Sequence, residues 1–147
     1  MNARLKFAAA TLCAMLLGIP AAQSDDYFAS TDLYVELGTA EGDFAAFPGN
    51  LKVEVGEIYR LILRNPSPFT HVAMAPEFGG TVVTTGIRRL PQGVPHMTGT
   101  IAGGIEVRSG ETTELYFVPF KQGRYKLFCE DRMHTVAGME ITIDVAE

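Results

Sequence analysis

Apolar and polar residues alternate along a series of short runs that begins near residue 32, and Gly, Pro or Asn separates most of the runs. In the first run, Leu33, Val35 and Leu37 would share one face of a strand. The runs are rich in β-branched and aromatic residues, which favours strands over helices. They cover residues 32–37, 51–55, 59–64, 71–74, 81–85, 105–107, 113–118, 125–128 and 139–145.

This spacing of strands and turns predicts an all-β protein, a sandwich or small barrel of about seven to nine strands. No run has the periodicity of an amphipathic helix of useful length. Residues 86–104 interrupt the pattern, since they are rich in Gly and Pro, and they contain His96. A segment of this length without strands is uncommon, so we expect it either to be functional or to hold local order that the pattern does not show.

The first 24 residues have the layout of a secretory signal peptide. Arg4 and Lys6 precede an apolar stretch over residues 7–19, and Ala22 and Ser24 supply the small residues that a signal peptidase reads. The apolar stretch is too short to be a permanent membrane anchor. We therefore predict an exported, periplasmic protein without stable membrane insertion.

Cleavage after Ser24 would leave residues 25–147 as a single domain, which is long enough for one continuous core. Loss of Arg4 and Lys6 would change the formal charge from −5 to about −7. An acidic domain is poorly suited to nucleic acid or to an anionic membrane surface. The charge favours a protein partner with a basic docking surface.

The predicted mature chain holds one cysteine, Cys129, whereas exported proteins normally use cysteines in disulfide pairs. His134 and Met139 follow it, each after four intervening residues. Thiolate, imidazole and thioether are ligands that copper prefers, and one Cys with two His and a distant axial Met makes a type 1 copper site. We expect a strand to deliver Cys129, and Gly138 to let the chain turn before Met139.

A second histidine is needed to complete such a site, and two are available. His71 opens a strand just after the turn residues Asn65 and Pro66, so it would lie at a sheet end, as Cys129 does. His96 lies in the irregular segment. The position of His71 favours it, with His96 as the alternative.

These motifs resemble those of the cupredoxin family of type 1 (blue) copper proteins. The resemblance runs from about residue 50 to the end of the chain. It implies a Greek-key β-sandwich that carries single electrons, with one copper ion bound by His71, Cys129, His134 and Met139. The matching motifs are Asn65-Pro66-x4-His71, Ser109-Gly110-Glu111-Thr112 and Gly123-x-Tyr125-x3-Cys129-x4-His134-x3-Gly138-Met139.

Two positions depart from the family pattern. Val72 stands where many members have an Asn that braces the cysteine loop, so the brace must differ here. Glu130 and Asp131 are acids where a small, polar or proline residue is more usual. Near the metal they would stabilise Cu(II) and lower the reduction potential, and facing outward they would shape partner docking.

Other interpretations of the same residues stay open at this stage. Cys129 could be a buried structural thiol, and Met139 could be a core residue with Met133 as the axial ligand. Cys129 and His134 could form a nucleophilic dyad. One Cys and two His would also bind zinc.

The first functional hypothesis is an exported electron carrier that exchanges electrons with protein redox partners and is not an enzyme. We expect the electron to leave at His134, beside the apolar Val136 and Ala137. The second hypothesis is a copper-binding protein for delivery, storage or resistance, and His96 with Met97 suits it better. The third is a metal-free β-sandwich that binds a protein.

Overall fold

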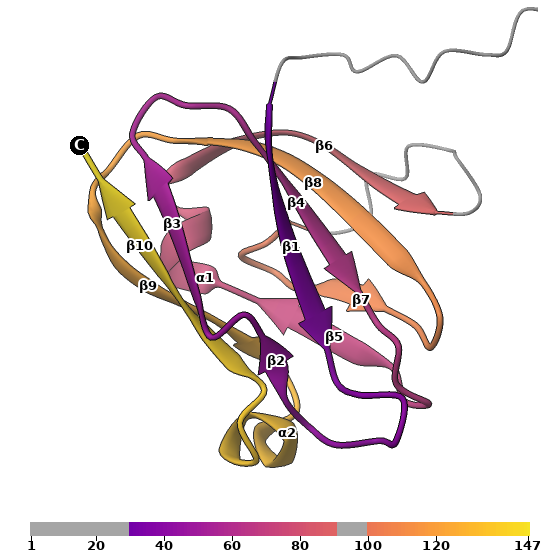
Figure 1. Ribbon diagram of the computed structural model, residues 1–147. Coiled ribbons are helices and arrows are strands. Elements are labelled where there is room, and N and C mark those ends of the chain that lie inside the picture. The colour runs from indigo at the N-terminus through magenta and orange to yellow at the C-terminus, as the bar shows by residue number, and fades with distance from the viewer. Residues whose placement is uncertain (1–29, 91–99) are drawn as a thin grey trace, which may run out of the picture.

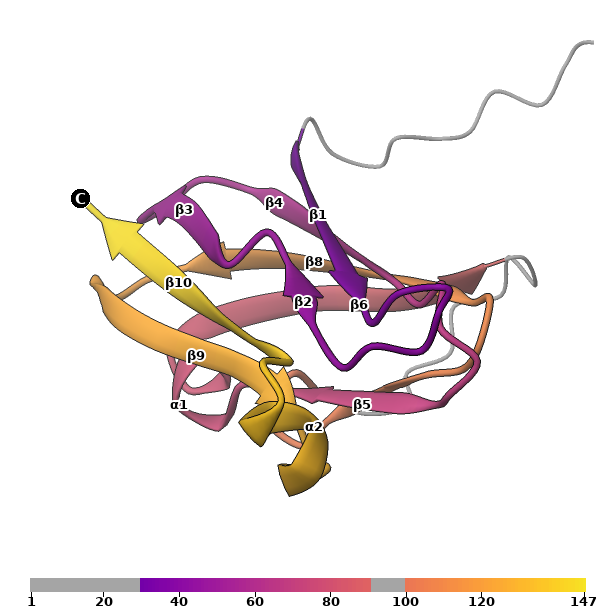
Figure 2. The same ribbon diagram turned by 60° about the horizontal axis from the view of Figure 1, so that its bottom comes forward.

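Two five-stranded sheets face each other in a sandwich, as the sequence predicts (Figures 1 and 2). The structure is a computed structural model, and it describes residues 30–90 and 100–147. The predicted signal peptide and His96 lie outside these residues, so the cleavage site and the role of His96 stay predictions. Within the described ranges, no helix is long and apolar enough to cross a membrane.

The first sheet has the strand order β2-β1-β4-β8-β6, and the second has the order β3-β10-β9-β5-β7. The strands of the first sheet are β1 (Thr31–Leu37), β2 (Ala46–Phe47), β4 (Tyr59–Arg64), β6 (Val82–Leu90) and β8 (Thr112–Pro119). Those of the second are β3 (Asn50–Glu54), β5 (His71–Met74), β7 (Ile105–Val107), β9 (Gly123–Cys129) and β10 (Glu140–Ala146). Two short helices, α1 (Pro76–Gly79) and α2 (Arg132–Val136), lie between strands.

Alternation along β9 decides where its last residue points. Tyr125, Leu127 and Cys129 are buried, while the residues between them face outward or are partly exposed. The inward residues of β9 join those of β10 and of the opposite sheet in one core. Cys129 therefore continues a row of core residues, and its thiol lies inside the end of the sandwich with 2% of its surface exposed.

The pairing of β5 with β9 brings two distant parts of the chain together. The strands are antiparallel, with Ala73 opposite Cys129. After β9, the N–H of Glu130 donates to the carbonyl of Val72 at 2.8 Å. The backbone of β5 thus ties the start of the cysteine loop to the strand that His71 opens.

The structure adds elements that the alternation did not predict. β2 has only two residues, and each helix is about one turn long, so none is long enough for an apolar pattern to repeat. The expectation that the irregular segment starts at Gly86 was wrong, because β6 continues to Leu90 along β8. Ile101 is buried at 1% exposure, so the end of that segment belongs to the core.

Candidate metal centre

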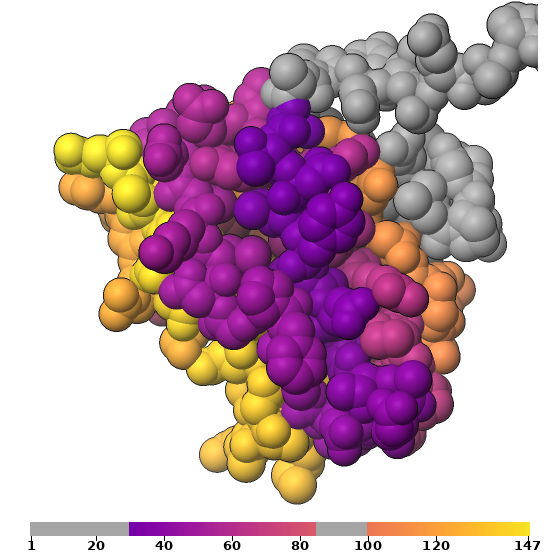
Figure 3. Space-filling model, in the orientation of Figure 1, coloured from indigo at the N-terminus to yellow at the C-terminus, as the bar shows by residue number. Residues whose placement is uncertain are grey.

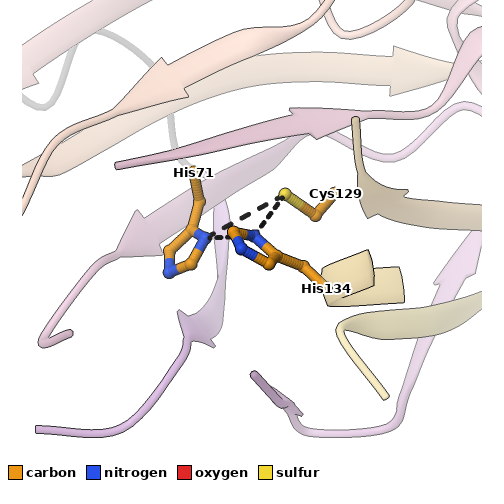
Figure 4. Close-up of side chains that lie close together, drawn as sticks. All are labelled: His71, Cys129 and His134. Carbon is orange, nitrogen blue, oxygen red and sulfur yellow. Dashed lines mark hydrogen bonds between the residues drawn. The ribbon is translucent and has the colours of Figure 1, made fainter. Parts of the chain in front are cut away.

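Three of the predicted ligands meet at one end of the sandwich, beside α2 (Figure 4). His71 comes from the start of β5, Cys129 from the end of β9, and His134 from the middle of α2. Both rings present Nδ1 to the thiol, and the facing atoms of all three residues lie within 4.8 Å of one another. Among the described residues this is the one such group of three potential metal ligands.

The distances between the three donor atoms match a single bound ion. The two Nδ1 atoms of His71 and His134 are 3.3 Å apart, and Cys129 Sγ lies 3.5 Å from His134 Nδ1 and 4.0 Å from His71 Nδ1. The point equidistant from the three atoms is about 2.1 Å from each, which is close to the usual metal–imidazole and metal–thiolate bond lengths of about 2.0–2.3 Å. One ion in the plane of this triangle would satisfy all three donors.

The two candidate axial methionines, Met139 and Met133, differ in how deeply they are buried. Met139 is fully buried, whereas the side chain of Met133 is 72% exposed on α2. The backbone of Met139 lies beside the site, because its carbonyl accepts from Cys129 N at 3.1 Å and its N–H donates to the His134 carbonyl at 3.0 Å. Burial therefore favours Met139 over Met133, and its ligation remains a prediction.

The loop between Cys129 and Met139 is held in shape by its own hydrogen bonds. Asp131 caps α2 by accepting from Met133 N at 2.8 Å, and Thr135 Oγ1 donates to the carbonyl of Cys129 at 2.7 Å. Gly138 has φ +114°, which lets the chain leave the helix and enter β10. These contacts position His134 relative to Cys129.

His71 is more deeply buried than His134. It is 1% exposed, and its Nε2 lies 2.8 Å from Ser67 Oγ, on the side of the ring away from the thiol. Burial lowers the pKa of His71 below its usual value, and the nearby His134 lowers it further. The ring therefore favours the neutral form near pH 7, which is the form that binds a metal.

Phe44 covers the site, and no pattern in the sequence indicates this. Its ring stacks on that of His134 at a centroid distance of 3.9 Å and an interplanar angle of 17°, and Phe69 packs behind it at 5.3 Å. Residues from the β1–β2 region meet the C-terminal segment at the bottom of the molecule (Figure 3). The side chain of His134 is consequently only 14% exposed. It is therefore less accessible than we expected from the sequence for the residue at which an electron leaves.

The two acids after Cys129 have different positions. Glu130 is exposed, while Asp131 Oδ2 lies 3.7 Å from His134 Nε2. The carboxylate of Asp131 is therefore close to the outer nitrogen of one candidate ligand. Of the two acids, Asp131 is therefore the one near the proposed metal, and its effect on the reduction potential stays a prediction.

The donor set suits a soft or borderline ion. One thiol and two imidazoles are the equatorial ligands of a type 1 copper site, and zinc would accept the same three. A nucleophilic dyad would use one imidazole to activate the thiol, so the second Nδ1 in contact with it would have no part. The arrangement therefore supports a metal site over a catalytic thiol.

Comparison with solved structures finds proteins of similar architecture. Auracyanin B has a TM-score of 0.54 at 17% identity, over 80% of this chain and 89% of that one. Auracyanin from the photosynthetic bacterium Roseiflexus castenholzii has a TM-score of 0.54 at 19% identity, over 82% of this chain and 100% of that one. The sequence matches no protein-family model, and no curated protein matches it in sequence.

The chain is also similar to part of a larger protein. A multi-copper oxidase from Pediococcus acidilactici gives a TM-score of 0.63 at 18% identity, over 97% of this chain but only 31% of the oxidase. At these identities the likeness concerns the fold. The auracyanins match this chain over nearly their whole length, whereas the oxidase matches it over one part.

Proposed function

We propose that this protein, which has a cupredoxin fold, is a type 1 copper protein that carries one electron at a time. The observation that carries the proposal is the triangle of His71 Nδ1, Cys129 Sγ and His134 Nδ1, whose centre is at bonding distance from all three atoms. Copper would supply the one-electron redox change. This function suits a small single domain, and it requires no catalysed reaction.

The protein's contribution is to hold the donors still. Cys129 is fixed by strand pairing, His71 by burial and its Ser67 contact, and His134 by α2 and the Phe44 stack. Donors that keep their positions in both oxidation states need little reorganisation when an electron moves. Buried Met139 and the surrounding core would tune the potential.

The proposed contact with redox partners is the surface around α2. Met133 and Val136 are 72% and 76% exposed on the helix that bears His134. Exposed acids, Glu41 and Asp43 in the β1–β2 loop and Glu130 after β9, flank this end of the molecule. We therefore propose an apolar contact with a basic rim on the partner, in the periplasm to which the signal peptide would direct the chain.

Copper delivery is the second candidate function, and the exposure of Met133 is what favours it. An exposed thioether beside His134 could receive Cu(I) as it leaves the site. The buried thiol and the covered His134 ring favour retention of the metal. The two functions therefore differ in how fast the protein gives up Cu(I).

The test is to load the protein with one equivalent of copper and to follow both redox cycling and metal loss. We expect an intense visible thiolate-to-copper band that ascorbate bleaches and a mild oxidant restores over repeated cycles. A Cu(I) chelator should then remove copper slowly, at the same rate from wild type and from Met133→Leu. Rapid removal that Met133→Leu slows would support delivery, and no stoichiometric copper binding would contradict both functions.

Replacement of Phe44 with Ala should speed copper loss. Aromatic pairs contribute about 0.5–1.5 kcal/mol beyond area burial, so loss of the stack on His134 should raise the rate of Cu(I) release about two- to tenfold. The measurement is the rate of Cu(I) transfer to the chelator. Phe69→Ala is the control, since Phe69 packs on Phe44 and no ring contact joins it to His134 among the contacts that the structure gives. Equal release from both variants would show that the stack does not retain His134.

A further inference from the structure

A buried polar network lies behind His71, on the side of the ring away from the proposed metal. Asn65 and Ser67 are both fully buried, in the connection between β4 and β5. Ser67 Oγ is 2.8 Å from His71 Nε2 and 2.7 Å from Asn65 Oδ1. The proposed function uses only the contact between Ser67 and His71, so the function of the rest of this chain of contacts needs a separate argument.

The orientation of the Asn65 amide follows from its surroundings. Its Nδ2 group donates to two backbone carbonyls, those of Phe69 at 2.7 Å and Val107 at 2.8 Å. The opposite orientation would place the amide oxygen against these two carbonyl oxygens. Oδ1 is thereby directed at Ser67, where it accepts from the backbone N–H at 3.0 Å and from the hydroxyl at 2.7 Å.

The direction of the Ser67–His71 hydrogen bond then follows. A hydroxyl has one hydrogen, and two acceptors already compete for that of Ser67: Asn65 Oδ1 at 2.7 Å and the Phe69 carbonyl at 3.3 Å. The short contact with His71 Nε2 therefore needs its hydrogen from the imidazole. His71 is then protonated on Nε2, and the lone pair of Nδ1 is directed at Cys129 and His134.

We propose that Asn65 and Ser67 are positioning residues that hold the hydrogen of His71 on Nε2 and so keep Nδ1 ready to bind the metal. The part concerning the metal rests on the proposed function, and the part concerning the hydrogen does not. The turn between β7 and β8 supports it, because Ser109 Oγ donates to the Ser67 carbonyl at 2.6 Å.

The first test locates the hydrogen in the copper-free wild-type chain. Long-range ¹H–¹⁵N NMR spectra of protein labelled in histidine distinguish a protonated ring nitrogen from one with a free lone pair. We expect His71 to carry its hydrogen on Nε2 in the copper-free protein and to keep it there with Cu(I) bound. A hydrogen on Nδ1 in the copper-free protein would overturn the proposal, whether or not copper binds.

The second test compares two serine variants by competition for Cu(I) with a chelator. Ser67→Ala removes the acceptor for Nε2–H, and loss of such an outer partner typically costs about 10–100-fold in metal affinity. Ser109→Ala removes a hydrogen bond to the backbone of the same loop and leaves the Ser67 hydroxyl in place, so its affinity should stay near that of wild type. In the spectra, we expect only Ser67→Ala to change the signals of the His71 ring.

The outcomes separate this inference from the proposed function. Wild-type protein that binds copper, with Ser67→Ala binding it equally well, would overturn the inference and leave the copper site intact. Equal losses in Ser67→Ala and Ser109→Ala would show that the loop acts only as a support, which also overturns it. Wild-type protein that binds no copper would refute the proposed function, and the spectra of the copper-free chain would still decide the position of the hydrogen.

Discussion

Replacement of Cys129 with Ser should abolish the visible thiolate-to-copper band of the copper-loaded protein. The band requires a thiolate bound to Cu(II), and a serine hydroxyl stays protonated and binds copper poorly at neutral pH. Cys129 is the one free cysteine among the described residues, and its Sγ is the third corner of the donor triangle. The measurement is the absorption spectrum after addition of one equivalent of Cu(II) to wild type and variant.

The variant must also be shown to fold. Serine is close to cysteine in size, so the buried row on β9 should survive, at the cost of a polar hydroxyl in an apolar position. Circular dichroism of the copper-free proteins provides this control. A visible band of undiminished strength in a folded Cys129→Ser protein would show that Cys129 is not a copper ligand.

The sequence predicted the sandwich well because its strands are half-buried. Strands such as β3 and β10 alternate between core and surface, so their apolar pattern has period two. Cys129 and His134 were predicted from ligand chemistry, and His71 was favoured by its position at a sheet end, while the resemblance to cupredoxins implied the full set. The structure brings all three together, since β5 and β9 pair side by side.

The surroundings of the site were less predictable, because they depend on contacts between distant segments. Phe44 lies in a loop and has no neighbour in sequence that signals its stack on His134. Ser67 lies in the first-histidine motif, yet its contact with Nε2 follows from the path of the chain between β4 and β5. The cap that Asp131 gives to α2 was readable in principle, but a helix of five residues has too short a pattern to detect.

Gly38 links these surroundings, and its replacement with Ala should weaken both the fold and the site. Gly38 follows β1 and starts the loop that carries Phe44, with φ +80°. A Cβ there would lie 2.7 Å from Ser67 Cβ and 3.2 Å from His71 Nε2. The chain can pass this close to the buried network only without a side chain at that position.

The expected effect of Gly38→Ala combines two costs that a second variant can separate. A left-handed backbone costs a non-glycine residue about 1–2 kcal/mol, and overpacking adds about 1–3 kcal/mol. The free energy of unfolding of Gly38→Ala should therefore be about 2–5 kcal/mol lower than that of wild type. Gly56 has a similar φ of +87° with no atom near its potential Cβ, so Gly56→Ala should show the backbone cost alone. Chemical denaturation of the copper-free proteins measures both changes.

Because the added methyl group in Gly38→Ala pushes on Ser67 and His71, that variant should also bind Cu(I) more weakly, whereas Gly56→Ala should bind it as wild type does. Equal stability losses and unchanged copper affinity in the two variants would show that the close approach of Gly38 does not position His71.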